Sequence, residues 1–383
     1  MNRIPVLLCG IGGYAAVYLN EFLDSSDESF TLAGVADPFA SSSPRFAELE
    51  KRGVPVFKNP LEFYDSGRTA ALAAIASPIH THYSYILTCF KHGSSVLCEK
   101  PVSGDLARLD DLIVKEEETG LFAAVGFQHS FSRNTQALKA DIMKGLFGKP
   151  LEFKGIFLPR RGDKYYHRNA WAGKLSFEGE TILDSPLCNA CSHDLHNMLF
   201  LLGGTMNSAA KVDSLEAELY QARPGIENYD AASIRAKTSG GVKLLFYTAH
   251  CVEKELFSLA EYRFEKAVIR WERMSSSSYT AAFYDGREKI YNYTDPAKEK
   301  QKIYDCLENA KTGTKPVCSL KTSRSHLECV VKAQGFPIIK AGREKLGQGS
   351  HEGDAFYYLP GLREAFLRSY EEAVLPSEAG FKV

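Results

Sequence analysis

Short apolar runs alternate with amphipathic segments through the first third of the chain. The runs that predict strands cover residues 4–9, 30–36, 70–76, 95–98 and 121–125. The segments between them are long enough for helices, for example 16–23, 44–52 and 82–92. Strands that alternate with helices favour a parallel sheet with right-handed crossovers. Residues 1–125 are therefore expected to form a doubly wound α/β domain of the Rossmann type.

The pattern changes after Gly126. Residues 134–145 predict a helix closed by glycine, and residues 150–158 predict a strand. The four serines at 275–278 predict a solvated loop tip. Further strand-like runs follow one another at 241–250, 257–260, 266–271 and 289–293. Consecutive strands favour an antiparallel sheet. Residues 126–383 are therefore expected to form an α+β domain with a large, open, mainly antiparallel sheet. The last forty residues show no pattern that places an element.

Composition and charge exclude several classes of protein. The chain is 44% hydrophobic and 24% charged, with a net charge of -1, so a basic face for nucleic acid is not expected. Since no stretch approaches about 18 uncharged apolar residues, neither a membrane span nor membrane partners are expected. The apolar start breaks at glycines too soon for a secretory signal. Nine scattered cysteines fit reduced thiols, so a cytoplasmic location is expected.

A glycine-rich turn joins the first predicted strand to the first predicted helix. Gly10 permits a tight turn, Gly12 lets the backbone approach a pyrophosphate, and the small Ala15 allows the helix to pack on the strand. Asp37 ends the next strand, 22 residues beyond Ala15, where an acid can accept hydrogen bonds from ribose hydroxyls. The spacing predicts a dinucleotide-binding site.

Asp37 favours NAD over NADP, because a carboxylate repels the additional phosphate of NADP. Ser41, Ser42, Ser43 and Arg45 follow closely and could contact that phosphate. The predicted cofactor is therefore NAD, with NADP as the less favoured alternative.

With these and other motifs, the sequence resembles the glucose–fructose oxidoreductase and inositol dehydrogenase (Gfo/Idh/MocA) family. Besides the glycine turn, the resemblance is carried by Ser77-Pro78 with His82, Glu99-Lys100-Pro101, His193 ten residues before Gly203, and Gly126-Phe127 through Gly145-x-x-Gly148-Lys149-Pro150. It implies a Rossmann domain and an open-sheet domain that often forms oligomer contacts, so a homodimer or homotetramer is expected. The cofactor contacts expected are Gly10, Ile11, Gly12, Gly13, Tyr14, Ala15, Asp37, Ser77, Pro78, His82, Glu99, Lys100 and Gln128.

Lys100 is the first candidate for catalysis. It follows a parallel strand, at the edge of the sheet where ligands bind. An ammonium group there can bond a substrate hydroxyl and stabilise the charge that develops on oxygen. In the family the peptide before Pro101 is commonly cis. The alternative is an ordinary surface lysine before a turn proline.

Two histidines form the second candidate. His193 and His196 are spaced i, i+3 and share a face if residues 192–202 are helical. Histidine exchanges protons near neutral pH, and the family resemblance implies that His193 is the acid/base. The family usually has Asp where His196 stands, to orient the acid/base, and often a substrate-contacting Asp where Asn189 stands. The alternative is a pair of structural histidines.

The segment Cys188-x-x-Cys191-x-His193-x-x-His196 also contains four residue types that bind zinc. Structural zinc sites usually place two ligand pairs on separate elements, about a dozen or more residues apart. No metal site is therefore expected here.

The segment around Trp171 is the candidate for substrate recognition. Trp171 could offer a flat apolar face to a sugar, and Arg168, Asn169 and Lys174 could bind hydroxyls or acids. A similar run occurs in a branch of the family thought to act on sugars and polyols. The alternative is a core tryptophan with solvated charges. The substrate contacts expected are Lys100, His129, Arg168, Trp171, Asn189 and His193.

These residues predict an NAD-dependent oxidoreductase that oxidises or reduces a secondary alcohol of a sugar, glycoside or cyclitol. Lys100, His193 and His196 are the expected catalytic residues. Two alternatives stay open. One is an enzyme that retains NAD and hydrolyses or epimerises a glycoside without net redox change. The other is a non-catalytic sensor that binds a dinucleotide.

Overall fold

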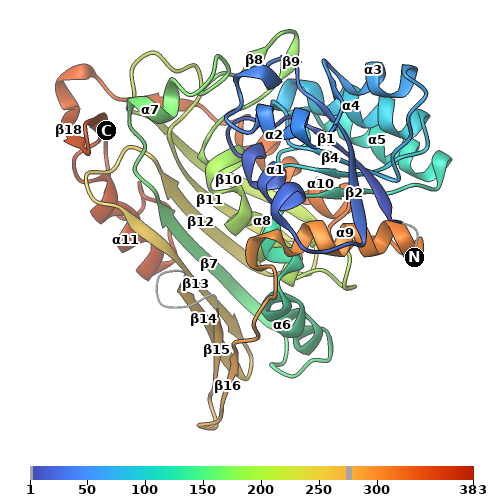
Figure 1. Ribbon diagram of the computed structural model, residues 1–383. Coiled ribbons are helices and arrows are strands. Elements are labelled where there is room, and N and C mark those ends of the chain that lie inside the picture. Colours follow the sequence, from blue (N-terminus) through green and yellow to red (C-terminus); the bar gives the residue numbers. More distant parts are fainter. Residues whose placement is uncertain (1–2, 273–277) are drawn as a thin grey trace. The chain divides into compact units, whose positions relative to one another are not determined.

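The computed structural model describes residues 3–272 and 278–383. It divides into two compact units (Figure 1). The first, here the Rossmann unit, ends at Phe131 and also contains residues 297–323. The second, here the sheet unit, contains residues 132–296 and 324–383. Most of the serine run at 275–278 lies outside the described residues.

The Rossmann unit is built on a parallel sheet. Among the described residues it has six strands in the order β3-β2-β1-β4-β5-β6. They are β1 (Ile4–Cys9), β2 (Phe30–Ala36), β3 (Val56–Phe57), β4 (Leu72–Ile75), β5 (Ser95–Cys98) and β6 (Ala123–Val125). Parallel strands are covered by helices on both faces, which explains why these segments are continuous apolar runs. The predicted doubly wound fold is confirmed, and the unpredicted β3 is too short to show a periodicity.

Helices connect these strands and cover the sheet. They are α1 (Ala15–Asp24), η1 (Ala40–Ser42), α2 (Phe46–Lys51), α3 (Pro60–Asp65), α4 (Ile79–Lys91), α5 (Leu106–Thr119) and η2 (Gln128–Phe131). Side chains fix two of the helix starts, because Asn59 accepts a hydrogen bond from the first turn of α3 and Asp105 does so for α5. The carboxyl ends of all the parallel strands meet at one edge, where loops with the predicted cofactor residues begin.

The second segment of the Rossmann unit carries η4 (Lys298–Lys300) and α9 (Gln301–Thr312). The sequence places residues 297–323 in a domain at 126–383, whereas the structure assigns them to the Rossmann unit. The reason is packing: α9 lies against β1, β4 and β5 and buries Ile303, Cys306 and Leu307. An amphipathic helix shows that it covers a core, but its pattern does not show which one.

The sheet unit is built on a large, mainly antiparallel sheet. In the described residues it has nine strands in the order β16-β15-β14-β13-β7-β12-β11-β10-β17. Pairing is antiparallel except between β7 and β12 and between β10 and β17. The strands are β7 (Pro150–Leu158), β10 (Val212–Gln221), β11 (Ala231–Thr238), β12 (Lys243–Ala249), β13 (Leu256–Phe264), β14 (Ala267–Glu272), β15 (Tyr279–Phe283), β16 (Glu288–Tyr291) and β17 (Ile338–Lys340). The predicted open sheet is confirmed.

Alternating side chains of this sheet enter two cores. Phe153 and Phe246 face a core shared with α6 (Arg133–Met143) and α8 (Ser192–Leu201). Ile156 and Tyr247 face another core, with α11 (Leu362–Glu372). Helix α10 (Leu320–Ala333) runs from residues of the Rossmann unit into the sheet unit. The shorter elements are α7 (Asp163–Tyr166), β8 (Ser176–Phe177), β9 (Glu180–Thr181), η3 (Pro186–Ala190), η5 (Arg343–Lys345), β18 (Gly347–His351) and β19 (Asp354–Tyr358).

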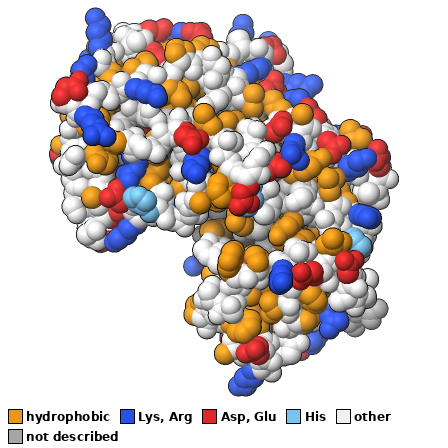
Figure 2. All heavy atoms as spheres, turned by 90° about the horizontal axis from the view of Figure 1, so that it is seen from above, with side chains coloured by type: hydrophobic (Ala, Val, Ile, Leu, Met, Phe, Trp, Pro, Cys, Tyr) orange, Lys and Arg blue, Asp and Glu red, His pale blue; other side chains and the backbone are white. Residues whose placement is uncertain are grey.

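Lys, Arg, Asp and Glu side chains are interspersed over the face shown in Figure 2. Among the helices of the described residues, none combines the length and the apolar character needed to cross a membrane. The nine cysteines are buried free thiols.

Candidate functional site

The glycine turn between β1 and α1 has open space beside it. Gly10 has a φ of +88°, and a Cβ there would lie 2.9 Å from backbone atoms of Ser77, so this position requires glycine. At Gly12 and Gly13, apart from chain neighbours, no atom of the described residues lies within 4 Å of a Cβ position. The start of α1 attracts negative charge through its backbone N–H groups. The turn therefore fits the pyrophosphate of a dinucleotide.

Asp37 links the end of β2 to this turn. Its Oδ2 accepts a hydrogen bond from the Ile11 N–H at 2.9 Å, and its Oδ1 accepts one from the Phe39 N–H at 2.8 Å. The residue is partly exposed, and each carboxylate oxygen has a further lone pair. Asp37 can therefore position the turn and also accept a hydrogen bond from a ligand hydroxyl.

His82 joins the loops that follow β4 and β5. Its Nδ1 lies 2.9 Å from the Pro101 carbonyl oxygen, and its Nε2 lies 2.8 Å from the Ser77 carbonyl oxygen. Burial lowers the pKa of His82 below its ordinary value, although the two carbonyls act in the opposite direction. The ring has a structural role between two loops of the candidate site. Its contact with a cofactor stays a prediction.

Glu99 is a buried carboxylate directly before Lys100, whose peptide bond to Pro101 is cis. Glu99 Oε1 accepts a hydrogen bond from the Tyr18 hydroxyl at 2.6 Å and forms an ion pair with Lys302 Nζ of α9. The Lys100 N–H lies 3.3 Å from the other carboxylate oxygen. These contacts fix the segment that carries Lys100.

The charges of this buried pair support one another. Burial raises the pKa of Glu99, but Lys302 and Tyr18 outweigh burial and hold it below its ordinary value of 4.5. Burial lowers the pKa of Lys302, but Glu99 outweighs burial and holds it above its ordinary value of 10.5. Both groups are therefore charged around neutral pH.

Replacing Lys302 with methionine is expected to lower the free energy of unfolding by about 3–5 kcal/mol, because Glu99 would remain buried without its counter-charge. Denaturant unfolding measures the loss. The matched control is Lys300→Met, because Lys300 lies in the same segment and pairs with Glu21 but is 36% exposed. Its expected loss is about 0–1 kcal/mol. Equal losses in the two variants would contradict the role of the buried pair.

The pH dependence provides a second readout. A carboxyl whose folded pKa is depressed stabilises the fold above its ordinary pKa, and this contribution is lost as the pH falls through the folded value. The difference in stability between wild type and Lys302→Met should therefore be full at neutral pH. It should shrink as the pH falls below about 4.5, where the Glu99 carboxyl becomes protonated in the unfolded chain, and be lost as the pH falls through the lower pKa of the folded state.

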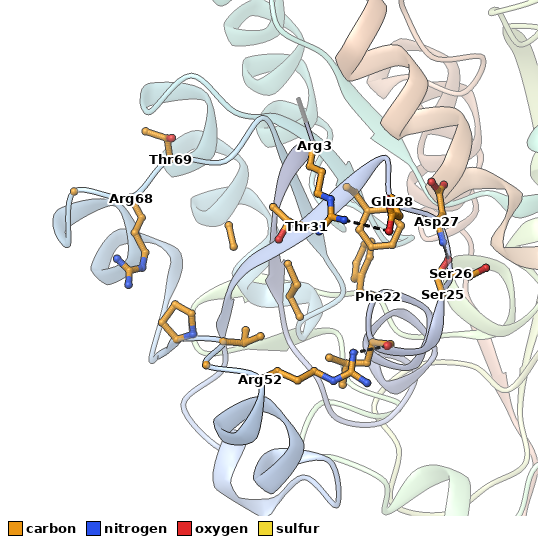
Figure 3. Close-up of a pocket in the computed structure, with 18 residues that line it drawn as sticks. Arg3, Phe22, Ser25, Ser26, Asp27, Glu28, Thr31, Arg52, Arg68 and Thr69 are labelled. Atoms are coloured by element: carbon orange, nitrogen blue, oxygen red, sulfur yellow. Dashed lines mark hydrogen bonds and ion pairs between the residues drawn. The ribbon is translucent and has the colours of Figure 1, made fainter. Parts of the chain in front are cut away.

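A surface pocket lies at the other edge of the Rossmann sheet (Figure 3). Arg3 and Thr69, which precede β1 and β4, contribute to its lining, and Arg3 Nη2 lies 3.5 Å from Glu28 Oε1. Ligands of open α/β sheets bind at the carboxyl ends of the strands, and this pocket is at the amino ends. It does not belong to the candidate cofactor site.

Helix α8 carries both predicted catalytic histidines, and its observed bounds confirm the predicted helix. The His196 side chain is fully buried and stacks on Phe200, with ring centroids 6.1 Å apart. His193 is partly exposed. Asp194 between them accepts a hydrogen bond from the Ser258 hydroxyl at 2.5 Å. His193 is therefore the more accessible of the two histidines, and their catalytic roles stay predictions.

A buried carboxylate organises the predicted substrate residues of the sheet unit. Asp184 is 2% exposed and accepts hydrogen bonds from Asn189 Nδ2 at 2.8 Å and from the Gly173 N–H at 2.7 Å. Arg168 Nη2 lies 3.5 Å from Asp184 Oδ2. The Arg168 guanidinium also lies over the partly exposed ring of Trp171, 4.9 Å from its centroid. We call Asp184, Arg168, Gly173, Trp171 and Asn189 the Asp184 cluster.

The cysteines of the alternative zinc segment are buried. Cys188 lies in η3, where its Sγ donates to the Ile182 carbonyl oxygen at 3.6 Å, and Cys191 precedes α8. Within residues 3–272 and 278–383, no group of three or more His, Cys, Asp or Glu side chains could hold a metal ion.

The structure gathers the predicted residues in two places. At the carboxyl edge of the Rossmann sheet lie Gly10, Ile11, Gly12, Gly13, Tyr14, Ala15, Asp37, Ser77, Pro78, Glu99, Lys100, Gln128 and His129. The sheet unit contains Arg168, Trp171, Asn189, His193 and His196. Lys100 and His193 belong to different units, so their meeting in one active site stays a prediction.

Sequence reasoning missed Lys302 and Tyr18 and gave Asp184 no role. Lys302 had one signal, since it shares a buried helix face with Ile303 and Cys306. A lysine in such a position needs a buried partner. Nothing in the local sequence identifies Glu99 as that partner.

Comparison with known proteins finds a matching family and solved structures of the same fold. Residues 4–127 match the model of an oxidoreductase family with an NAD-binding Rossmann fold, Gfo/Idh/MocA. The chain is 29% identical over 195 residues to an inositol 2-dehydrogenase of Rubrobacter xylanophilus, covering 51% of each protein. It is 30% identical over 158 residues to an NAD(+)-dependent scyllo-inositol 2-dehydrogenase of Bacillus subtilis, covering 40% of this chain and 44% of the relative. The matches span about half the length of these curated relatives, or less.

Solved structures match over more of the chain. The WlbA dehydrogenase of Bordetella pertussis, solved with NADH and UDP-GlcNAcA, has a TM-score of 0.70 at 18% identity. The aldose-aldose oxidoreductase of Caulobacter crescentus, solved with glycerol, has a TM-score of 0.70 at 15% identity. In both cases the match covers 87% of this chain and 97% of the other. These likenesses confirm the two-part fold.

Proposed function

We propose that the protein is an NAD-dependent oxidoreductase acting on a secondary alcohol of a sugar or cyclitol, because residues 4–127 match the Gfo/Idh/MocA oxidoreductase family. One observation carries the proposal. The open glycine turn, Asp37 and Lys100 all lie at the carboxyl edge of one parallel sheet, where such folds bind ligands. The inositol dehydrogenases among its relatives support this class of substrate.

The preference for NAD rests on Asp37 and Arg45. In a Rossmann fold, a carboxylate at the end of the second strand accepts hydrogen bonds from the ribose hydroxyls and repels a 2′-phosphate. Asp37 directly follows β2 and occupies this position. The Arg45 guanidinium is held by Asp24 at 2.7 Å and by Glu48, so its charge is already compensated. Neither feature favours the additional phosphate of NADP.

Replacing Asp37 with alanine is expected to weaken NADH binding about 10–100-fold, because hydrogen bonds to a charged group contribute about 1.5–3 kcal/mol. NADPH should lose less or gain, because the repulsive carboxylate is gone. Fluorescence titration with both cofactors measures the two effects. Asp27→Ala is the matched control, because Asp27 bonds the Ser29 N–H at the opposite edge of the sheet. Unchanged NADH affinity in Asp37→Ala would argue against this position for the ribose.

Each residue of the proposed site would have its own role in the reaction. A bound nicotinamide supplies the acceptance or return of a hydride. Lys100 Nζ donates a hydrogen bond to the substrate oxygen and stabilises its developing charge. The imidazole of His193 takes the hydroxyl proton during oxidation and returns it during reduction. The Asp184 cluster holds Arg168 and Asn189 ready for further hydroxyls of the substrate.

The test is a substrate panel. Purified protein is incubated with NAD+ and with sugars, cyclitols and glycosides, while absorbance reports NADH and mass spectrometry reports a loss of two hydrogens. A keto product with an equal amount of NADH is the expected result. A changed glycoside without NADH would replace the proposal with a retained-cofactor cycle. Cofactor binding without change in any mixture would favour a sensor.

We also propose that the protein acts as a homodimer or homotetramer in a reducing compartment such as the cytoplasm. Nine buried thiols support the reducing compartment. Light scattering during size-exclusion chromatography measures the mass, and a monomer would contradict the oligomer.

A further inference from the structure

Basic and aromatic side chains meet where three strands of the large sheet end. Arg161 follows β7, His250 directly follows β12, and Arg223 follows β10. Because β7 and β12 are parallel neighbours, Arg161 and His250 emerge at the same edge. Tyr165 and Tyr166 of α7 complete the group, which we call the Arg161 cluster. The chemistry proposed above uses none of its members.

Two tyrosine rings hold this cluster together. The Tyr165 ring centroid lies 5.2 Å from Arg161 Cζ and 5.2 Å from the centroid of His250. The Tyr166 hydroxyl lies 2.9 Å from His250 Nδ1, and Arg223 Cζ lies 4.5 Å from the Tyr166 ring centroid. Stacked arginines and rings keep the donors in fixed positions.

Three donor atoms of the cluster have no acceptor. Arg161 Nε, Arg223 Nη1 and His250 Nε2 are buried and bond no other group in the described part of the chain. His250 is 2% exposed and Arg223 is 7% exposed, so bulk water does not replace the missing partners. Buried donors without acceptors are rare because desolvating them is costly.

The tautomer of His250 follows from its surroundings. Burial, Arg161 and Arg168 lower the pKa of His250 well below its ordinary value, so the imidazole is neutral. Burial raises the pKa of Tyr166 well above its ordinary value, so its hydroxyl keeps its proton. Among the described residues the Tyr166 hydroxyl has no acceptor other than His250 Nδ1, which assigns the hydroxyl as the donor and leaves the ring proton on Nε2.

The charges of the cluster leave one cation uncompensated. Arg223 is paired with Asp163, and Arg168 lies beside Asp184. In residues 3–272 and 278–383, no carboxylate lies within ion-pair distance of Arg161. Arg161 as a whole is partly exposed, although its Nε is buried.

The Arg161 cluster is continuous with the Asp184 cluster. The guanidinium of Arg168 lies over Tyr165, 3.8 Å from its ring centroid, and also over Trp171. A molecule bound at Asn189 and Trp171 could therefore extend a substituent toward Arg161.

We propose that Arg161 and His250 bind an oxyanion of the substrate, so that the preferred substrate is an acidic sugar or polyol, such as a uronate or aldonate, rather than a neutral one. This inference rests on the proposed function. Arg161 offers two adjacent N–H groups to one carboxylate, and His250 Nε2 offers a third donor. One uncompensated cation matches the single charge of a carboxylate. A sugar phosphate shares the oxyanion chemistry and forms a separate arm of the test.

The test compares binding to the protein saturated with NAD+. Calorimetry measures the affinities of D-glucuronate, D-gluconate, D-glucose and D-glucose 6-phosphate for wild type, Arg161→Gln and Arg160→Gln. We expect an acid to bind about 10–100-fold more tightly than glucose, and Arg161→Gln to remove this advantage. Arg160→Gln is the matched control and should keep it. Arg160 donates to the Glu253 carbonyl oxygen at 2.8 Å and stacks on Phe356, outside the cluster.

Equal affinities for acids and glucose in wild type would overturn the proposal, as would an equal loss for acids and glucose in Arg161→Gln. Tighter binding of the phosphate than of both acids would keep the oxyanion site and replace the carboxylate. Arg161→Lys and thermal unfolding of each variant separate a lost contact from a lost fold, because lysine restores the charge. Acid binding through Arg161 without any NADH would refute the proposed function alone. NADH from neutral sugars and from no acid, at a rate unchanged in Arg161→Gln, would refute the oxyanion site alone.

Discussion

Replacing Lys100 with alanine is expected to lower kcat about 10²–10⁴-fold while NADH still binds, because the charge on the substrate oxygen would lose its nearest donor. Lys100 follows β5 at the carboxyl edge, and Glu99 beside it is fixed by Tyr18 and Lys302. These contacts therefore fix the backbone segment that carries the Lys100 side chain. Steady-state turnover of the substrate found by the panel measures the loss, and fluorescence titration measures cofactor binding.

Lys91→Ala is the matched control for this prediction. Lys91 belongs to the same unit and ends α4, just before the amino end of β5. Its replacement should leave turnover within about two-fold, as for other exposed positions away from a site. Full activity in Lys100→Ala would remove Lys100 from the mechanism. A parallel loss of NADH affinity would instead assign it to cofactor binding.

Replacing His193 with alanine is expected to cost about 10²–10⁴-fold in kcat, because no side chain would then exchange the hydroxyl proton. The pH profile is the decisive readout. Wild type should show a limb from an ionising base that His193→Ala lacks, and a base from solution should partly rescue the variant at high pH. A structural histidine would give neither the changed profile nor the rescue.

His167→Ala and His196→Phe complete the second experiment. His167 is exposed and bonds the Asp163 carbonyl oxygen, so its loss should leave turnover nearly unchanged. His196 is buried and stacks on Phe200, and phenylalanine can keep that stacking. If His196→Phe unfolds at the wild-type temperature and keeps its pH profile, His196 supports the helix. An altered profile would show that it orients His193.

The fold could be predicted where a local pattern reflects burial. Parallel strands buried on both faces are continuous apolar runs, and three of them, β1, β2 and β5, have the predicted bounds. The segment 297–323 could not be assigned in this way. Lys302 of α9 contacts Glu99 of the Rossmann sheet, and the two residues are 203 positions apart in the sequence. A contact at such a separation leaves no periodic trace in either segment.

The candidate site also contains residues that a local pattern locates and residues whose contacts no local pattern shows. Gly10, Asp37 and Lys100 could be predicted because each follows a strand whose end the apolar pattern locates. Arg168, Trp171 and Asn189 were expected from their residue types, but the role of Asp184 in joining them could not be predicted, because the cluster lies in irregular loops and in the π-helical turn η3. There, hydrogen bonds such as the one from Gly173 to Asp184 replace any repeating pattern. The partner of such a polar side chain becomes visible only in three dimensions.

The Rossmann unit is built from two separate segments of the chain, so its folding depends on the order in which the ribosome makes them. Its sheet is encoded before residue 132, but Lys302 is made 171 residues after Phe131. At about 5–20 residues per second, the nascent sheet waits roughly 10–30 s for this lysine. During that interval Glu99 has no counter-charge, and the surface later covered by α9 stays open to water or to a chaperone. The Rossmann unit therefore completes its fold only after α9 has been made.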